Sequence, residues 1–138
     1  MTPGLLLDTC ALLWSVDPNA RAQRTRAILT EARAAQRTIH VSPVSAQELG
    51  QLLRKGRLTL AMPLRQWFAV ILSQPGVGIT DLSVEVMIAS NELPDSFHND
   101  PADRMLVATA REKGLRIVTS DRAILAYAER GHVLALAC

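Results

Sequence analysis

Residues 101–121 have the sequence PADRMLVATAREKGLRIVTSD and contain the clearest change from helix to strand in the chain. Pro101 suits the first turn of a helix, basic residues occupy the last turn and Gly114 follows, so we predict a helix over residues 101–113. The apolar, partly β-branched residues 115–119 then predict a buried strand. A helix followed at once by such a strand is typical of α/β domains with parallel sheets.

The same alternation extends outward in both directions. We predict further strands over residues 4–8, 38–42, 77–82 and 132–136, and further helices over residues 21–36, 44–54, 64–72, 83–91 and 122–130. The pattern indicates an α/β fold whose central, mostly parallel sheet is flanked by helices. Because such sheets bind ligands at the carboxyl ends of their strands, we expect the functional side chains at that edge.

Length and composition agree with one globular domain over residues 1–138. The chain is 49% hydrophobic and 20% charged, which excludes disordered and collagen-like proteins. Aromatic residues make up only 4%, so aromatic platforms that stack on single-stranded bases are not expected. The formal charge is +2, and thirteen of the fifteen basic residues are arginines, which suit bidentate phosphate or carboxylate contacts.

We expect a cytoplasmic protein without membrane association. The N-terminal segment has no basic region and Asp8 interrupts its apolar run, so a signal peptide is not predicted. The sequence also has no apolar run long enough to span a bilayer. Cys10 and Cys138 lie at opposite ends of the chain and make neither a disulfide scaffold nor a zinc site.

Two aspartates lie at the carboxyl ends of predicted strands. Asp8 comes after Leu5-Leu6-Leu7, and Asp121 comes after the strand at residues 115–119, so both are expected at the carboxyl edge of the sheet. An aspartate in this place also serves as a helix N-cap, which is the structural alternative for each of them.

Two further acids lie near the starts of predicted helices. Glu48 falls in the first turn of the helix at 44–54, where Ser45 and Glu48 fit a capping box. Asp103 is the third residue of the helix at 101–113, with Asp100 as its N-cap, and an acid there complements the helix dipole.

The four acids Asp8, Glu48, Asp103 and Asp121 come from four different strand-to-helix corners on one edge of the sheet. Four clustered carboxylates repel one another unless a cation neutralises them, and oxygen ligands favour Mg²⁺ or Mn²⁺ over zinc. One or two such ions activate water against a phosphodiester. The residues themselves therefore indicate metal-dependent phosphoryl chemistry.

Four motifs resemble a known family over nearly the whole chain. They are LLLDTCALLW at 5–14, VSPVSAQEL at 41–49 followed by RKGRL at 54–58, HNDPADRMLVATA at 98–110 and VTSD at 118–121. With these motifs the sequence resembles PIN-domain ribonucleases, and it is most similar to the VapC-type toxins of bacterial toxin–antitoxin pairs.

The resemblance implies a three-layer α/β sandwich and a Mg²⁺-dependent endoribonuclease in which Mn²⁺ can substitute. By position it assigns the metal and catalytic roles to the same four acids, with Thr9 and Ser120 as supporting polar residues. It also implies an RNA substrate, a cognate antitoxin and a toxin homodimer. The exposed apolar residues for a partner are expected around Leu52, Leu53, Leu60, Trp67 and Phe68.

Several residues have roles outside the acidic set. We expect Asp81 to cap the helix after the third strand, Arg104 to form a structural ion pair, and His98 to lie in an exposed loop. Basic residues in two segments, 21–37 and 54–57, are candidates for contacts with RNA phosphates, the alternative being a solvated face.

Three competing functions remain open at this point. A PIN-like module that binds RNA or protein without catalysis has the same fold. A Mg²⁺-dependent phosphatase of the haloacid dehalogenase type needs a second aspartate two residues after Asp8, where this chain has Cys10. A phospho-receiver domain with Asp81 as acceptor needs paired acids after the first strand and a lysine after the fifth, and neither is present.

Overall fold

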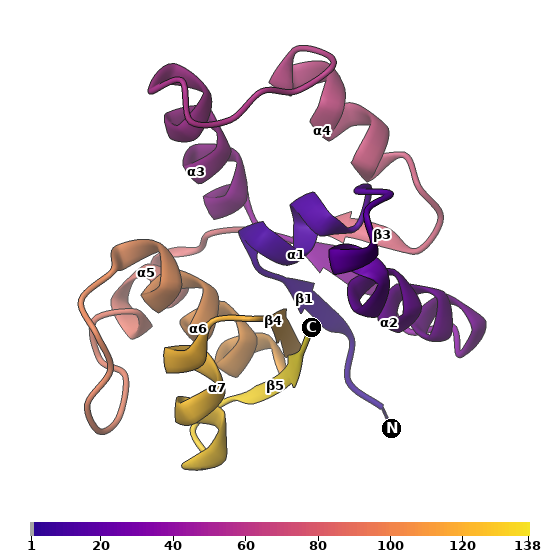
Figure 1. The fold of residues 1–138 in the computed structure, drawn as a ribbon. Helices are drawn as coiled ribbons and strands as arrows, with labels where there is room; N and C mark the ends of the chain where they lie inside the picture. The colour runs from indigo at the N-terminus through magenta and orange to yellow at the C-terminus, as the bar shows by residue number, and fades with distance from the viewer. Residues whose placement is uncertain (1) are drawn as a thin grey trace.

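The computed structural model of the protein describes residues 2–138 and is built around one five-stranded sheet (Figure 1). All four strand pairings are parallel and the order is β3-β2-β1-β4-β5, which confirms the predicted parallel α/β fold. The strands are β1 (Leu5–Leu7), β2 (Ile39–Val41), β3 (Val77–Ile79), β4 (Arg116–Thr119) and β5 (Leu134–Ala137). The α-helices are α1 (Thr9–Trp14), α2 (Gln23–Ala34), α3 (Pro43–Arg54), α4 (Leu64–Leu72), α5 (Val84–Ala89), α6 (Pro101–Lys113) and α7 (Arg122–Glu129).

The helices form a layer on each face of the sheet. Alternate residues of the central strand β1 enter the two layers: Leu5 and Leu7 pack with α1, α2 and α4, whereas Leu6 packs with α6 and α7. All three leucines are buried, which explains why this strand is a continuous apolar run instead of an alternating one. The three-layer arrangement is therefore confirmed.

The N-terminal region contains a short helix that the sequence patterns did not predict. Helix α1 begins directly after Asp8, whose side chain accepts a hydrogen bond from the Ala11 amide at 2.8 Å. A 3₁₀ turn at Ala20–Ala22 then precedes α2, which begins at Gln23. The turn replaces the first residues of the helix predicted from residue 21.

The third strand ends earlier than predicted, and this changes the role of Asp81. Strand β3 ends at Ile79, and the cap of α5 is Ser83, whose hydroxyl accepts from the Val86 amide at 3.2 Å. Asp81 pairs instead with Lys113 at 2.8 Å, so the prediction of an Asp81 cap is wrong. Ser83 caps α5 in place of Asp81 because it directly precedes the helix, where its oxygen reaches the backbone amides of the first turn that have no partner within the helix.

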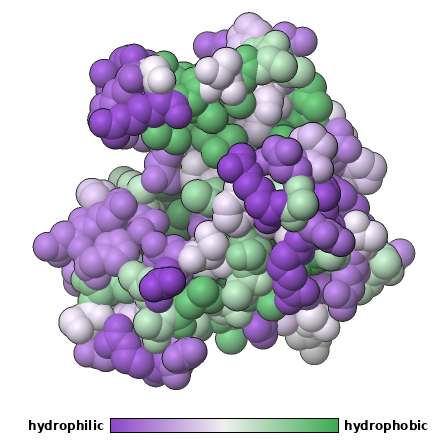
Figure 2. Space-filling view, viewed as in Figure 1, coloured by the Kyte–Doolittle hydropathy of each residue, from purple (hydrophilic) through white to green (hydrophobic). Residues whose placement is uncertain are grey.

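One residue of the expected partner surface is buried in the structure, whereas the others are half-buried: Leu52, Leu53, Leu60 and Phe68. Trp67 is only 7% exposed and belongs to the core under α4, and Phe68 packs against it edge to face. The large exposed apolar side chains include Val84, Met87 and Ile88 on α5. Figure 2 shows hydrophobic surface gathered over α3 and α4 and a hollow between them and the α5–α6 side.

Across residues 2–138, no helix combines the length and the apolar character needed to cross a bilayer.

Candidate active site

Asp8 lies at the carboxyl end of β1 and is 7% exposed. One carboxylate oxygen, Oδ1, caps α1, and the other, Oδ2, accepts a hydrogen bond from Thr119 Oγ1 at 2.5 Å. Burial raises the pKa of Asp8, hydrogen bonds oppose the shift, and the charges of Asp121 and Glu48 raise it further. Asp8 is thus held rigidly among other acids.

Thr119 connects Asp8 to the end of β4. Its hydroxyl is fully buried, donates to Asp8 and accepts from the Asp121 amide at 2.9 Å. Asp121 in turn caps α7, since its Oδ2 accepts from the Ile124 amide at 2.9 Å. Ser120 is exposed, and the hydroxyl that donates to Asp8 is that of Thr119, a residue that the sequence patterns had not singled out.

Glu48 is placed by α3, which begins one residue earlier than predicted. The cap is Ser42, whose hydroxyl accepts from the Val44 amide at 3.0 Å, and Pro43 occupies the first turn. Glu48 therefore lies in the second turn, and the capping box of Ser45 with Glu48 is wrong. The Glu48 carboxylate instead accepts a hydrogen bond from the Thr9 hydroxyl, which also lies 3.0 Å from the hydroxyl of Ser45.

Asp103 lies in the first turn of α6, behind the predicted Asp100 cap, which accepts from the Ala102 amide at 2.9 Å. The pKa of Asp103 is raised to about 7. Burial is the largest cause, the charges of Asp100, Asp121 and Glu48 add to it, and His98 opposes it. At neutral pH this carboxyl is therefore poised between its charged and neutral forms.

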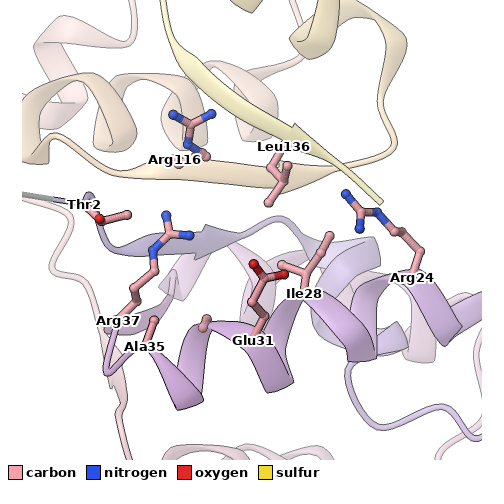
Figure 3. Close-up of a pocket in the computed structure, with 9 residues that line it drawn as sticks. Thr2, Arg24, Ile28, Glu31, Ala35, Arg37, Arg116 and Leu136 are labelled. Carbon is pink, nitrogen blue, oxygen red and sulfur yellow. The ribbon is translucent and has the colours of Figure 1, made fainter.

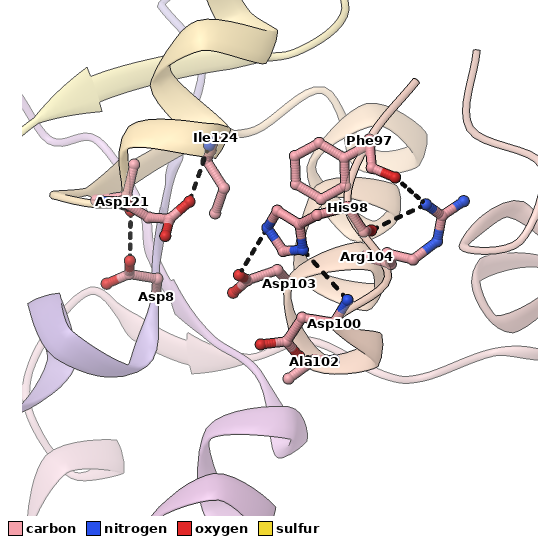
Figure 4. A network of polar contacts seen from close by, with 10 residues as sticks. Asp8, Phe97, His98, Asp100, Ala102, Asp103, Arg104, Asp121 and Ile124 are labelled. Atoms are coloured by element: carbon pink, nitrogen blue, oxygen red, sulfur yellow. Dashed lines mark hydrogen bonds and ion pairs between the residues drawn. The ribbon is translucent and has the colours of Figure 1, made fainter. Parts of the chain in front are cut away.

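His98 is part of the site, in contrast to its expected place in an exposed loop. Its Nε2 lies 3.2 Å from Asp103 Oδ2, and its Nδ1 accepts a hydrogen bond from the Asp100 amide at 3.2 Å (Figure 4). Because Nδ1 accepts, the proton of the neutral ring lies on Nε2, which donates to Asp103. The only sequence signal for this contact is the short distance in sequence from His98 to the start of α6.

Arg104 holds the loop that presents His98. Its guanidinium donates to the carbonyls of Ser90 at 2.8 Å, Phe97 at 3.0 Å and His98 at 3.1 Å. The Phe97 ring stacks on the His98 ring with centroids 4.4 Å apart. Arg104 therefore binds backbone carbonyls where an ion pair with a carboxylate was expected, and it has a structural role in the site.

The assembled cluster can hold a metal ion. One ligand atom from each of His98, Asp103 and Asp121 lies within 4.8 Å of the others. Asp8 and Glu48 stand outside this closest group. The charge of Glu48 raises the pKa of Asp103, and the charge of Asp121 raises the pKa of Asp8. Burial is the largest cause of the raised pKa values of Asp8 and Asp103, and the neighbouring acids add to it, so the described residues do not neutralise this negative charge.

Comparisons with known proteins agree with this architecture. A family model described as PIN domain matches residues 5–130. Ribonuclease VapC22 of Mycobacterium tuberculosis is 37% identical over 123 residues, which cover 88% of this chain and 89% of that protein. Two solved structures share the fold at low identity.

The first is VapBC2 from Rickettsia felis bound to a promoter DNA fragment, with a TM-score of 0.71, 16% identity and coverage of 96% of this chain and 97% of that one. The second is DNA-bound VapBC from Salmonella typhimurium, with a TM-score of 0.62, 19% identity and coverage of 99% and 98%. On the family match and the 37% identical relative, the chain belongs to the PIN-domain family.

Proposed function

We propose that this PIN domain is an endoribonuclease and the toxin of a toxin–antitoxin pair, and that it hydrolyses RNA phosphodiesters at the carboxylate cluster. The observation that supports this most strongly is the convergence of four acids from four separate segments, with the pKa of Asp103 raised to about 7. Clustered carboxylates repel one another, so a divalent cation bound among them stabilises the folded protein. The 37% identical relative is itself named a ribonuclease.

The donor set fits Mg²⁺, with Mn²⁺ as a substitute, because carboxylate oxygens dominate it. Asp103 and Asp121 would bind the ion, and Asp8 and Glu48 would complete the acidic environment. When bound, such an ion supplies Lewis-acid chemistry that polarises the phosphodiester and makes water more acidic.

The protein's own groups orient the carboxylates. Hydroxyls fix two of them, since Thr119 donates to Asp8 and Thr9 donates to Glu48. His98 donates to Asp103 from Nε2 and leaves the other Asp103 oxygen for a ligand. Preorganised ligands of this kind are what metal-assisted hydrolysis requires.

The toxin role requires a protein partner that restrains the nuclease, and two solved structures that share this fold are VapBC proteins. An apolar cavity of about 210 Å³ between α1, α2 and α4 suits an apolar segment of such an antitoxin; its lining includes Leu12, Leu29, Val70 and Val77. An arginine that follows this segment would pair with the acidic cluster and compete with the metal. We also infer a homodimer, whose apolar contacts the exposed side chains of α5 would supply.

The experiment that tests catalysis against simple binding compares two glutamate variants. Glu48→Gln removes a charge from the cluster, and Glu85→Gln removes one from the first turn of α5, outside the cluster. We expect Glu48→Gln to abolish RNA cleavage and Glu85→Gln to leave it unchanged. Equal cleavage by both variants would refute the catalytic role, and RNA binding without cleavage by the parent chain would favour the binding module.

A further inference from the structure

A basic groove runs along one face of the sheet. It is a cavity of about 430 Å³ between α2 and the strands β4 and β5 (Figure 3). Its lining consists of Thr2, Arg24, Ile28, Glu31, Ala32, Ala35, Arg37, Arg116 and Leu136. We call this cavity the arginine groove. Three arginines face one glutamate in it, so its lining has a net charge of 3 − 1 = +2.

The charges of these arginines are not neutralised by neighbouring carboxylates. Arg37 donates twice to the Pro3 carbonyl, at 2.9 and 2.7 Å, and Arg116 donates to the Ala135 carbonyl at 3.2 Å. Carbonyls fix the position of a guanidinium without cancelling its charge. Arg24 is exposed, and no residue within 2–138 engages it in a hydrogen bond or an ion pair.

Other arginines of residues 21–37 differ from the three that line the groove. Arg21 pairs with the Asp17 carboxylate at 3.2 Å, and Arg26 donates to the carbonyls of Asp17 and Asn19. Neither of them lines the groove. Within residues 21–37, the structure therefore distinguishes two arginines held in local contacts from two that line the groove, Arg24 and Arg37.

The groove leads from the start of the strands to the catalytic edge. At one end, Arg116 is the first residue of β4. At the other end, Leu136 precedes Ala137, which pairs with Thr119, and the Cys138 amide donates to the Thr119 carbonyl at 3.0 Å.

We propose that the arginine groove binds the phosphodiester backbone of the RNA substrate next to the scissile bond, an inference that rests on the proposed ribonuclease function. A carboxylate cluster repels the phosphates of a polymer, so the strand needs positive surface close to the point of cleavage. Guanidiniums supply bidentate donors for phosphate oxygens. No aromatic residue lines the groove, so binding there depends on the backbone and not on stacked bases.

The test measures binding of a fluorescent single-stranded oligouridylate in EDTA, where the proposed cleavage cannot proceed. The double variant Arg24→Gln with Arg116→Gln is compared with a control of equal charge, Arg65→Gln with Arg111→Gln, whose exposed arginines lie outside residues 21–37 and do not line the groove. We expect the groove variant to lower the slope of log affinity against log salt by about 0.7 per lost phosphate contact and the control to preserve it. Glu31→Gln should strengthen binding, because it removes the acid that faces the phosphates.

The single variant Arg24→Gln guards against misfolding, since Arg24 is exposed and its replacement breaks no contact that stabilises the fold. Unchanged affinity and slope in the groove variants, or equal losses in groove and control variants, would overturn the proposal. Polyglutamate is titrated in parallel. If the groove variant loses polyglutamate and keeps RNA, the groove binds an acidic protein segment and the proposal fails.

Cleavage with Mg²⁺ is measured separately from binding. A parent chain that binds RNA through the groove and never cleaves it would contradict the proposed function and leave the groove in place. A parent chain that cleaves RNA while the groove variants bind normally would overturn the groove alone.

Discussion

His98 shows how a single side chain outside the acidic set influences the cluster. Its Nε2 donates to Asp103, and the Asp100 amide fixes the tautomer that makes this possible. We predict that His98→Ala lowers Mn²⁺ affinity about tenfold, the lower end of the effect of removing a group that orients a metal ligand. His98→Gln, which keeps an N–H donor, should recover most of the affinity.

Isothermal titration calorimetry with Mn²⁺ measures both variants. Parent-like affinity in His98→Ala would show that the contact with Asp103 is irrelevant to metal binding. Equal losses in the Ala and Gln variants would instead mean that the imidazole is needed for more than its N–H.

Asp103 predicts a pH dependence of stability in metal-free protein. Its pKa is about 7 in the folded state against an ordinary value of 3.8, so between these values the folded state binds more protons than the unfolded state. The stability contribution of Asp103 therefore falls as pH rises from about 4 to about 7. Asp103→Asn removes this loss.

We expect Asp103→Asn in EDTA to be more stable than the parent above pH 7. The gain should be only roughly 1–2 kcal/mol, because solvent screens the charge of a partly buried group. The difference should shrink towards pH 4. Thermal unfolding followed by circular dichroism across this range checks the prediction, and a variant that is less stable than the parent at pH 8 would contradict it.

At the scale of elements, the N-cap of α3 positions Glu48 while the N-cap of α5 positions no residue of the site. Ser42 and Ser83 make the same kind of hydrogen bond to a first-turn amide. Replacing either by alanine should cost about 1 kcal/mol of stability. We predict that Ser42→Ala also lowers RNA cleavage and that Ser83→Ala does not. Equal cleavage rates for the two variants would show that the start of α3 does not control Glu48.

The sequence patterns located the elements well where local signals are strong. Helix α6 begins at Pro101 and ends just before Gly114, as predicted. Asp8 and Asp121 lie at the ends of their strands, at the expected edge of the sheet. The cap of α3 was misassigned because Ser45 offers a cap signal as good as that of Ser42. Only the packed structure decides between two local signals of similar strength.

The parts of the site that were missed depend on tertiary contacts. His98 reaches Asp103 because Arg104 binds the carbonyls of the loop that contains it. Thr119 donates a hydrogen bond to Asp8, although the two residues are 111 positions apart in sequence. Such contacts have no periodicity or spacing that a single sequence displays, whereas the acids themselves follow the strand ends and were therefore accessible to prediction.

At the scale of the whole molecule, charge in the cluster links metal binding to folding. A cation that binds only the folded state stabilises it, by about 2.7 kcal/mol at a concentration one hundred times Kd. We predict that Mn²⁺ raises the melting temperature by several degrees and that the rise is lost in the double variant Asp103→Asn with Asp121→Asn. A melting temperature that is insensitive to Mn²⁺ in the parent would contradict a metal site in the cluster.

The central claim is that the carboxylate cluster makes this PIN domain a metal-dependent ribonuclease. The most direct measurement is the cleavage rate of a labelled single-stranded RNA as Mg²⁺ or Mn²⁺ is added to metal-free protein, for the parent, Asp121→Asn and the control Asp81→Asn. We predict no cleavage in EDTA, saturable recovery with metal, at least about a hundredfold loss in Asp121→Asn and parent-like rates in Asp81→Asn. Cleavage that persists in EDTA, or that survives in Asp121→Asn, would contradict the account.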